Sequence, residues 1–181
     1  MKHLFWPVAL ACASLTTAPA APLTSDDRKH FDPIAVGISG ATDITLLKGV
    51  SFGQVRIARE LKSSRIVQIH GFRFYDFPLP LSTAESAELR RLLTNKSTYE
   101  RLTDGKLCGG FHPDYSIAWR RGEQVFYVLI CFGCQEFRLL GAGYELRTDA
   151  NPKAFDKLEA ILFGKGHTQP KVQKRLTHRW S

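Results

Sequence analysis

Residues 115–131 read YSIAWRRGEQVFYVLIC, and this stretch decides the fold. Over residues 115–120 apolar side chains alternate with polar or small ones, the period expected of a strand that buries one face. Residues 121–123 (Arg-Gly-Glu) then form a turn. The run Val125–Cys131 is almost entirely apolar, which is typical of a central strand buried on both faces. The stretch therefore predicts an antiparallel hairpin in the middle of a sheet.

Further strands are predicted on both sides of this hairpin. Residues 64–75 are rich in β-branched and aromatic side chains and end before Pro78, so they predict another strand. Two short strands, 137–140 and 144–147, flank the glycine-rich turn at 141–143. Residues 44–55 are apolar but irregular, and we expect a strand there as well.

Two amphipathic helices complete the predicted fold. Ser82 and Glu85 have the spacing of a capping box, and leucines follow at helical spacing, which predicts a helix over residues 83–94. Residues 149–152 (Asp-Ala-Asn-Pro) supply a cap and a first-turn proline for a second helix that ends at Gly164. The order β-α-β-β-β-β-α predicts an α+β fold, mainly an antiparallel sheet of about four to five strands with two amphipathic helices packed on one side.

The chain divides into four segments. Residues 1–20 have a basic start, a short apolar run and the sequence Ala-Pro-Ala at 18–20, which predicts a cleaved signal peptide and hence an exported protein. Cys12 offers the alternative of lipidation, which would anchor the protein to a membrane. Residues 21–41 are interpreted as a linker with at most a short helix near 26–31, because they contain two prolines and two glycines. Residues 42–163 form a single domain, and residues 164–181 a basic flexible tail.

Composition excludes several classes of protein. The 181 residues are 44% hydrophobic and 23% charged, unlike a collagen-like, low-complexity or multi-pass membrane protein. Without residues 1–20 the chain keeps 24 basic and 17 acidic side chains, and the tail holds five of the basic ones and none of the acidic ones. Residues 21–163 therefore carry only +2. The tail either contacts anionic envelope components weakly or is simply solvated. No specific nucleic-acid binding is expected, because aromatic and basic residues do not interleave.

The chemistry concentrates in two segments, CGGFHPDY at 108–115 and CFGCQE at 131–136. Three thiolates and one imidazole, the set Cys108, His112, Cys131 and Cys134, match the Cys3His count of a closed zinc site. A hairpin loop at Arg121 and Gly122 would place His112 opposite Cys131. A loop shifted by one residue would place Asp114 there instead. Either register brings the two segments together.

Other interpretations of the cysteines compete with zinc. The sequence has four cysteines, and three remain once Cys12 is set aside with residues 1–20. Three cysteines in an exported chain allow one disulfide, between Cys108 and either Cys131 or Cys134, and leave one buried thiol. A reactive thiol is a third possibility, with Cys108 or Cys134 as nucleophile and His112 as base. A redox role is disfavoured because no helix begins at the Cys-x-x-Cys pair to stabilise a thiolate. His70 is a further possible ligand, although a core histidine is the commoner outcome.

The segments IHGFRFY (69–75), CGGFHPDY (108–115) and ICFGCQE (130–136) resemble a group of uncharacterised bacterial exported or lipoprotein-like proteins. The resemblance covers roughly residues 64–163 and implies no particular activity. Gln135 follows the second cysteine of the pair, which excludes the Cys-x-x-Cys-His attachment of haem.

Two hypotheses follow from the sequence. The first is a non-enzymatic exported domain for binding or assembly in the cell envelope, with a structural Cys/His cluster. The second is an enzyme that uses the same cluster as a zinc or thiol active site. A structural cluster is expected to be closed and buried, whereas a catalytic one opens onto a pocket.

Overall fold

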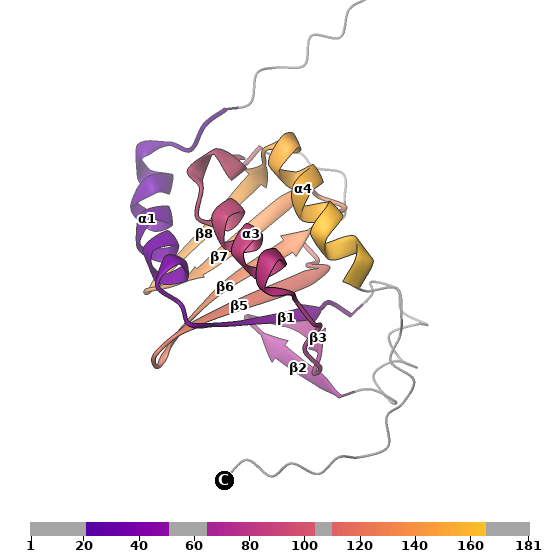
Figure 1. The fold of residues 1–181 in the computed structure, drawn as a ribbon. Helices are drawn as coiled ribbons and strands as arrows, with labels where there is room; N and C mark the ends of the chain where they lie inside the picture. The colour runs from indigo at the N-terminus through magenta and orange to yellow at the C-terminus, as the bar shows by residue number, and fades with distance from the viewer. Residues whose placement is uncertain (1–20, 51–64, 104–109, 166–181) are drawn as a thin grey trace, which may run out of the picture.

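The computed structural model describes residues 21–50, 65–103 and 110–165. Over these residues the chain forms a six-stranded antiparallel sheet, a separate two-stranded hairpin and three α-helices (Figure 1). The large sheet consists of β1 (Asp43–Lys48), β4 (Tyr99–Arg101), β5 (Tyr115–Arg121), β6 (Gln124–Cys131), β7 (Glu136–Gly141) and β8 (Tyr144–Ala150). The hairpin consists of β2 (Ile66–Ile69) and β3 (Phe72–Tyr75). The helices are α1 (Ser25–Ser39), α3 (Thr83–Leu93) and α4 (Pro152–Leu162), and the 3-10 turns are η1 (Lys96–Thr98) and η2 (Phe163–Lys165).

The large sheet is a meander with one extra strand on each side, in the order β1-β5-β6-β7-β8-β4. The central hairpin predicted from the sequence is confirmed, with Tyr115 opposite Ile130 and Arg121 opposite Gln124. The loop is therefore Gly122-Glu123, and Gly122 adopts the positive φ of 57° that such a tight turn needs. This is the shifted one of the two registers, and it places Asp114, not His112, level with Cys131.

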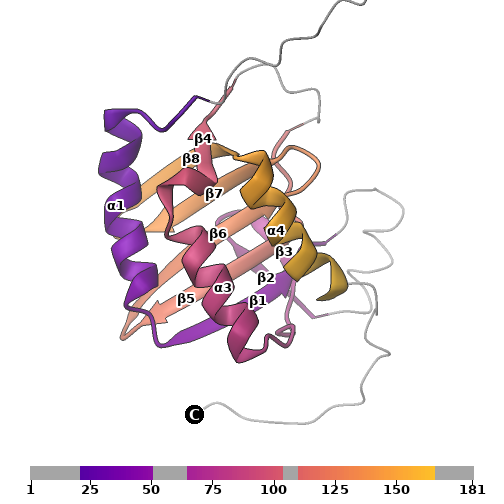
Figure 2. The same cartoon turned by 45° about the horizontal axis from the view of Figure 1, so that its top comes forward.

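The two faces of the sheet are covered differently. The three helices lie on one face, and the β2–β3 hairpin lies on the other (Figures 1 and 2). β6 serves both layers: Val128 and Ile130 pack into the core under the helices, while Leu129 packs against the hairpin with Phe74. A strand buried on both faces was expected from the apolar run; Phe126 and residues 128–131 are buried as predicted, whereas Val125 and Tyr127 are partly exposed.

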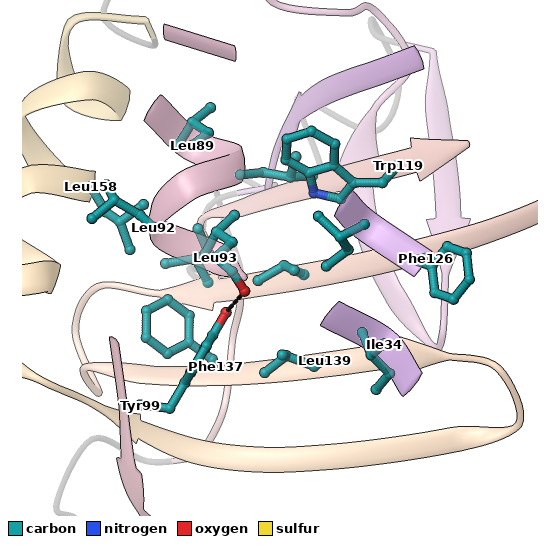
Figure 3. Close-up of a cluster of buried hydrophobic side chains, with 14 of the residues drawn as sticks. Ile34, Leu89, Leu92, Leu93, Tyr99, Trp119, Phe126, Phe137, Leu139 and Leu158 are labelled. Atoms are coloured by element: carbon teal, nitrogen blue, oxygen red, sulfur yellow. Dashed lines mark hydrogen bonds between the residues drawn. The ribbon is translucent and has the colours of Figure 1, made fainter. Parts of the chain in front are cut away.

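The larger core lies between the helices and the sheet. Trp119, Leu93 and Phe137 are fully buried there (Figure 3). The hydroxyl of Tyr99 donates a hydrogen bond of 2.7 Å to the Leu93 carbonyl. This bond satisfies the one polar atom of a buried ring, and burial raises the pKa of that phenol.

Residues 21–41 are not the linker that the sequence suggested. Residues 25–39 form α1, which carries Phe31, Ile34 and Ile38 into the core. A capping box between Thr24 and Asp27 begins the helix, and Pro33 lies inside it. The prolines and glycines therefore gave a wrong prediction of a linker. Burial of the apolar face of α1 contributes more stability than the one interior proline costs.

The other two helices are confirmed. α3 begins at the Ser82–Glu85 capping box, with Glu85 N–H 3.2 Å from the serine hydroxyl and the Ser82 N–H 2.7 Å from the carboxylate. α4 begins after Asn151, whose side-chain oxygen accepts from the Ala154 N–H at 3.3 Å. All three helices pack on one side, as predicted for two.

The strand count was underestimated, although the α+β class is confirmed. Residues 64–75 form a hairpin rather than one strand, because the chain reverses at His70 and Gly71, both with positive φ. β4 was missed because it is only three residues long. The predicted strand at 44–55 is β1, and its second half lies outside the described residues.

Both outer strands of the sheet meet a segment from elsewhere in the chain. Beside β4, Pro22 pairs with Glu100, and Arg101 N–H donates to the Ala21 carbonyl at 2.8 Å. Beside β1, Leu79 N–H donates to the Leu46 carbonyl at 2.8 Å. Among the helices that the structure describes, none has the length and apolar character needed to cross a bilayer.

Candidate Cys/His cluster

The β6–β7 connection is a tight turn that carries both described cysteines. Cys131 and Glu136 close it as the last cross-strand pair. Gln135 adopts a positive φ of 51°, and its N–H donates to the Phe132 carbonyl at 3.3 Å. The turn therefore brings Cys134 back beside the end of β6, so that the two cysteines of the Cys-x-x-Cys pair lie on the same side of the sheet end.

Asp114 attaches the loop 110–114 to this turn. Its carboxylate accepts a 2.7 Å hydrogen bond from the Phe132 N–H, and its own N–H donates to the Ile130 carbonyl at 2.7 Å. On the other side, Gly49 N–H donates to the Asp114 carbonyl at 2.7 Å. A Cβ on Gly49 would lie 2.0 Å from the Pro113 carbonyl oxygen, so only glycine permits this approach.

The imidazole of His112 is oriented by the backbone. Its Nδ1 lies 2.9 Å from the Gly110 carbonyl oxygen, which can only accept, so Nδ1 carries the proton. In the neutral ring Nε2 then presents its lone pair. Nε2 points toward the turn, where a Cβ on Gly133 would lie 3.8 Å from it. Metal-ligating histidines are usually held by this kind of second hydrogen bond.

The two cysteines differ in state. Cys131 is a free, fully buried thiol. Burial raises its pKa, backbone hydrogen bonds with His112 and Cys134 oppose that rise, and the nearby Asp114 and Glu136 carboxylates add to it. Cys134 is also buried, with its sulfur 3.4 Å from the Gly110 carbonyl oxygen, and it has a further interaction.

The ligand atoms of His112, Cys131 and Cys134 all lie within 4.8 Å of one another. Neighbouring ligand atoms of a tetrahedral zinc are about 3.3–3.8 Å apart, so these donors need only small shifts to share one ion. The donor set, two sulfurs and one imidazole nitrogen, suits Zn²⁺. Three of the four predicted residues are thus brought together. Cys108, the fourth, lies outside the described residues.

His70 does not belong to this cluster. It lies at the β2–β3 turn with its ring 5.2 Å from that of Tyr127, so it packs on the hairpin side of the sheet. Sequence reasoning missed the pair formed by Glu136, which is buried beside the turn, and Arg147, which donates two hydrogen bonds of 2.7 and 3.0 Å to it. The alternation of side chains along β7 does not indicate, from the sequence alone, that the Glu136 side chain is buried.

Two cavities were also missed. The larger holds about 500 Å³ between the N-terminal segment, β4 and the start of α4, and the smaller holds about 160 Å³ between α3 and α4. Their residues come from three separate parts of the sequence, 22–28, 91–100 and 151–157, so no local motif could have indicated them.

Comparison with known proteins finds no matching family model, no similar curated protein and no similar solved structure. The fold and the site themselves define an α+β domain with a buried Cys/His cluster at one end of its sheet.

Proposed function

We propose that this chain is an exported, non-enzymatic protein for binding or assembly in the cell envelope, and that its Cys/His cluster is structural. The observation that carries the proposal is the state of Cys131. Its thiol is fully buried, and its pKa is raised, so little of the reactive thiolate forms near neutral pH. Such a sulfur holds structure together and does not attack a substrate.

The cluster fastens two segments that are distant in the sequence. Loop 110–114 precedes β5, and the 131–136 turn joins β6 to β7. A covalent or metal link there fixes the end of the central hairpin. Two forms of that link remain proposals: a zinc ion held by Cys108, His112, Cys131 and Cys134, or a disulfide.

Two observations favour a disulfide between Cys108 and Cys134. Cys131 is free, so it is not the partner. The Cys134 sulfur lies 3.4 Å from the Gly110 carbonyl oxygen, and Cys108 precedes that residue by two positions. We therefore favour this form over zinc.

The deciding experiment measures zinc and thiols on the same sample. The chain is purified without chelators, bound zinc is measured by mass spectrometry, and free thiols are counted after denaturation. For the processed chain, no zinc and one thiol are expected. One zinc per chain with three thiols would instead establish the Cys3His site.

An enzyme is the second candidate, and the orientation of His112 favours it. The half-buried ring has Nδ1 on the Gly110 carbonyl and Nε2 beside the cysteine turn, an orientation that suits a zinc ligand or a general base. His112→Ala separates the two functions. A structural role predicts a lower urea midpoint of unfolding. A catalytic role predicts an unchanged midpoint and loss of an activity measured on the native chain.

Export is proposed from residues 1–20, which lie outside the described part of the chain. Expression in a bacterial host followed by fractionation and intact-mass measurement tests it. A periplasmic product beginning at Ala21 is expected. A membrane fraction carrying lipid mass on Cys12 would show the lipidated form, and a cytoplasmic product that keeps Met1 would contradict export.

A further inference from the structure

The two cavities described above are neighbours in the fold. Ser97 and Asn151 line both of them, so the cavities adjoin at η1 and at the residue that caps α4. Together they hold a volume within the range of small-molecule sites. They lie on the helix side of the sheet end, beside the outer strand β4.

The smaller cavity is basic. Arg91, Lys153 and Lys157 line it, and none of its wall residues is acidic. The neighbouring acid is Glu88, which forms an ion pair with Arg91 and also interacts electrostatically with Lys157. The three cations therefore exceed this one carboxylate by two positive charges around the smaller cavity of about 160 Å³.

The larger cavity adds two more cations, Arg28 and Lys96, against one carboxylate, Glu100. That carboxylate accepts a 3.0 Å hydrogen bond from the Asn151 side-chain amide. Over both cavities the five cations outnumber Glu88 and Glu100 by three. This local excess is larger than the surplus of +2 that residues 21–163 carry as a whole.

The two cavities also differ in polarity. The wall of the larger one is mostly apolar, with Pro22, Leu23 and Tyr99 among its residues, while the wall of the smaller one is mostly polar. The first turn of α4 borders the smaller cavity, and its dipole adds positive potential to that of the lysines.

We propose that the adjoining cavities bind an anionic amphiphile as a single molecule that passes over Ser97 and Asn151. Its phosphate or carboxylate lies among Arg91, Lys153 and Lys157, and its apolar chain or ring lies against Pro22 and Leu23. This inference rests on the proposed function, because it gives the binding role a ligand class. It is independent of whether the cysteines hold zinc or a disulfide.

Calorimetric titration of the full chain with monomeric octyl phosphate tests the proposal. Octyl glucoside, which has the same tail without a charge, and inorganic phosphate, which has the charge without a tail, are the comparators. Because charge-assisted hydrogen bonds and tail burial both contribute, octyl phosphate is expected to bind at least about tenfold more tightly than either.

Charge-matched variants locate the binding. Lys153→Gln with Lys157→Gln is expected to weaken octyl phosphate binding about tenfold or more. Lys29→Gln with Arg65→Gln removes the same charge from exposed ion pairs outside both cavities, and is expected to leave affinity within about twofold. Ser97→Trp fills the junction of the cavities and is expected to abolish binding. Circular dichroism confirms that each variant is folded.

Three outcomes would overturn the proposal. One is equal binding of octyl phosphate and octyl glucoside, and another is equal weakening by both charge variants. The third is binding to phosphatidylglycerol vesicles without binding of monomeric octyl phosphate, which would assign the cations to a membrane surface. The zinc and thiol measurement is unaffected by any of these, so failure here is distinguishable from failure of the structural cluster.

Discussion

Gly49 shows how closely one backbone approaches another at the Cys/His cluster. Its N–H supports the Asp114 carbonyl, and no side chain fits between it and Pro113. Gly49→Ala is expected to lower the free energy of unfolding by about 2 kcal/mol or more, because rigid backbone faces the new methyl group. Urea denaturation measures the loss. Gly40→Ala is the control, since its Cβ would meet the flexible Arg121 side chain at 3.1 Å. Equal losses in both variants would contradict this account.

Arg147 neutralises the acid beside the cysteine turn. Glu136 is 3% exposed, whereas its arginine partner is 44% exposed on the side chain. Arg147→Met leaves a buried carboxylate unpaired, and we expect a loss of about 1–3 kcal/mol, reduced by the solvent around the arginine.

Urea denaturation of the single variants and of the Arg147→Met, Glu136→Gln double variant gives their coupling. The double variant is expected to recover part of the loss, since no charge is left buried. Lys29→Met, which breaks an exposed pair with Asp26, is the control and is expected to change stability by less than about 0.5 kcal/mol. If the stability losses of Arg147→Met and Glu136→Gln simply added in the double variant, the two side chains would not be coupled and the pairing would be contradicted.

At this scale the sequence indicated the cluster but not its surroundings. Cys131 and Cys134 could be found because three-residue spacing is local, and His112 because the hairpin brings it alongside. The Glu136–Arg147 pair joins adjacent strands through their register, and several registers suit the same residues. The cations of the cavities are scattered from Arg28 to Lys157, and only the packing of α3, α4 and the N-terminal segment gathers them.

An ion pair links the start of α3 to the 3-10 turn that follows α4. Lys165 Nζ lies 2.8 Å from the Glu85 carboxylate, which also accepts from the Ser82 N–H. The hydrogen bond from Lys165, followed by those from Ser82, lowers the pKa of Glu85 from 4.5 to about 2.

The lowered pKa predicts an acid-dependent stability. The folded chain binds this proton less readily than the unfolded chain, so the stabilisation is complete above about pH 4.5 and is lost as pH falls toward 2. Glu85→Gln is expected to flatten the fall of the urea midpoint in that window. Glu123→Gln, in the exposed β5–β6 turn, is the control. An unchanged slope in Glu85→Gln would contradict the assignment.

Helices and strands were predictable from the sequence where a capping motif or a turn residue marks their ends. The Ser82–Glu85 box and the Asn151-Pro152 start identified α3 and α4 correctly. α1 has an equally good capping box, Thr24–Asp27, but the helix was not predicted because Pro33 inside it suggested a linker. The β2–β3 reversal was missed because only one of its two turn residues, Gly71, is a glycine, and positive φ at a non-glycine residue such as His70 is uncommon.

For the molecule as a whole, the unequal covering of the sheet suggests unequal stability. The helix side holds the large core, whereas the hairpin side depends on a small cluster around Phe74, Leu129 and Leu140. Phe74→Ala is expected to remove about 3–5 kcal/mol from the docking of the hairpin.

Hydrogen exchange checks this prediction. Amides of β2 and β3 are expected to exchange faster in Phe74→Ala, while those of β6 and β7 keep most of their protection. Uniform acceleration across both layers would show that the molecule unfolds as one unit.

The α+β class was predictable from the sequence because the spacing of hydrophobic residues indicates helices and strands along the whole chain. The position of the β2–β3 hairpin was not predictable, because it depends on which apolar residues of the sheet remain uncovered after the helices pack.

The pairing of Pro22 with Glu100 and of Leu79 with Leu46 has a consequence for how copies of the chain meet. A bare outer strand is a template on which a second molecule can add its own strand, the first step toward fibrils. Here short pieces of the same chain occupy positions on both outer strands, and proline at one of them cannot donate to a newcomer. The path of the backbone thus limits strand addition at both outer strands, and trimming the first residues of the described domain is expected to expose β4 to intermolecular pairing.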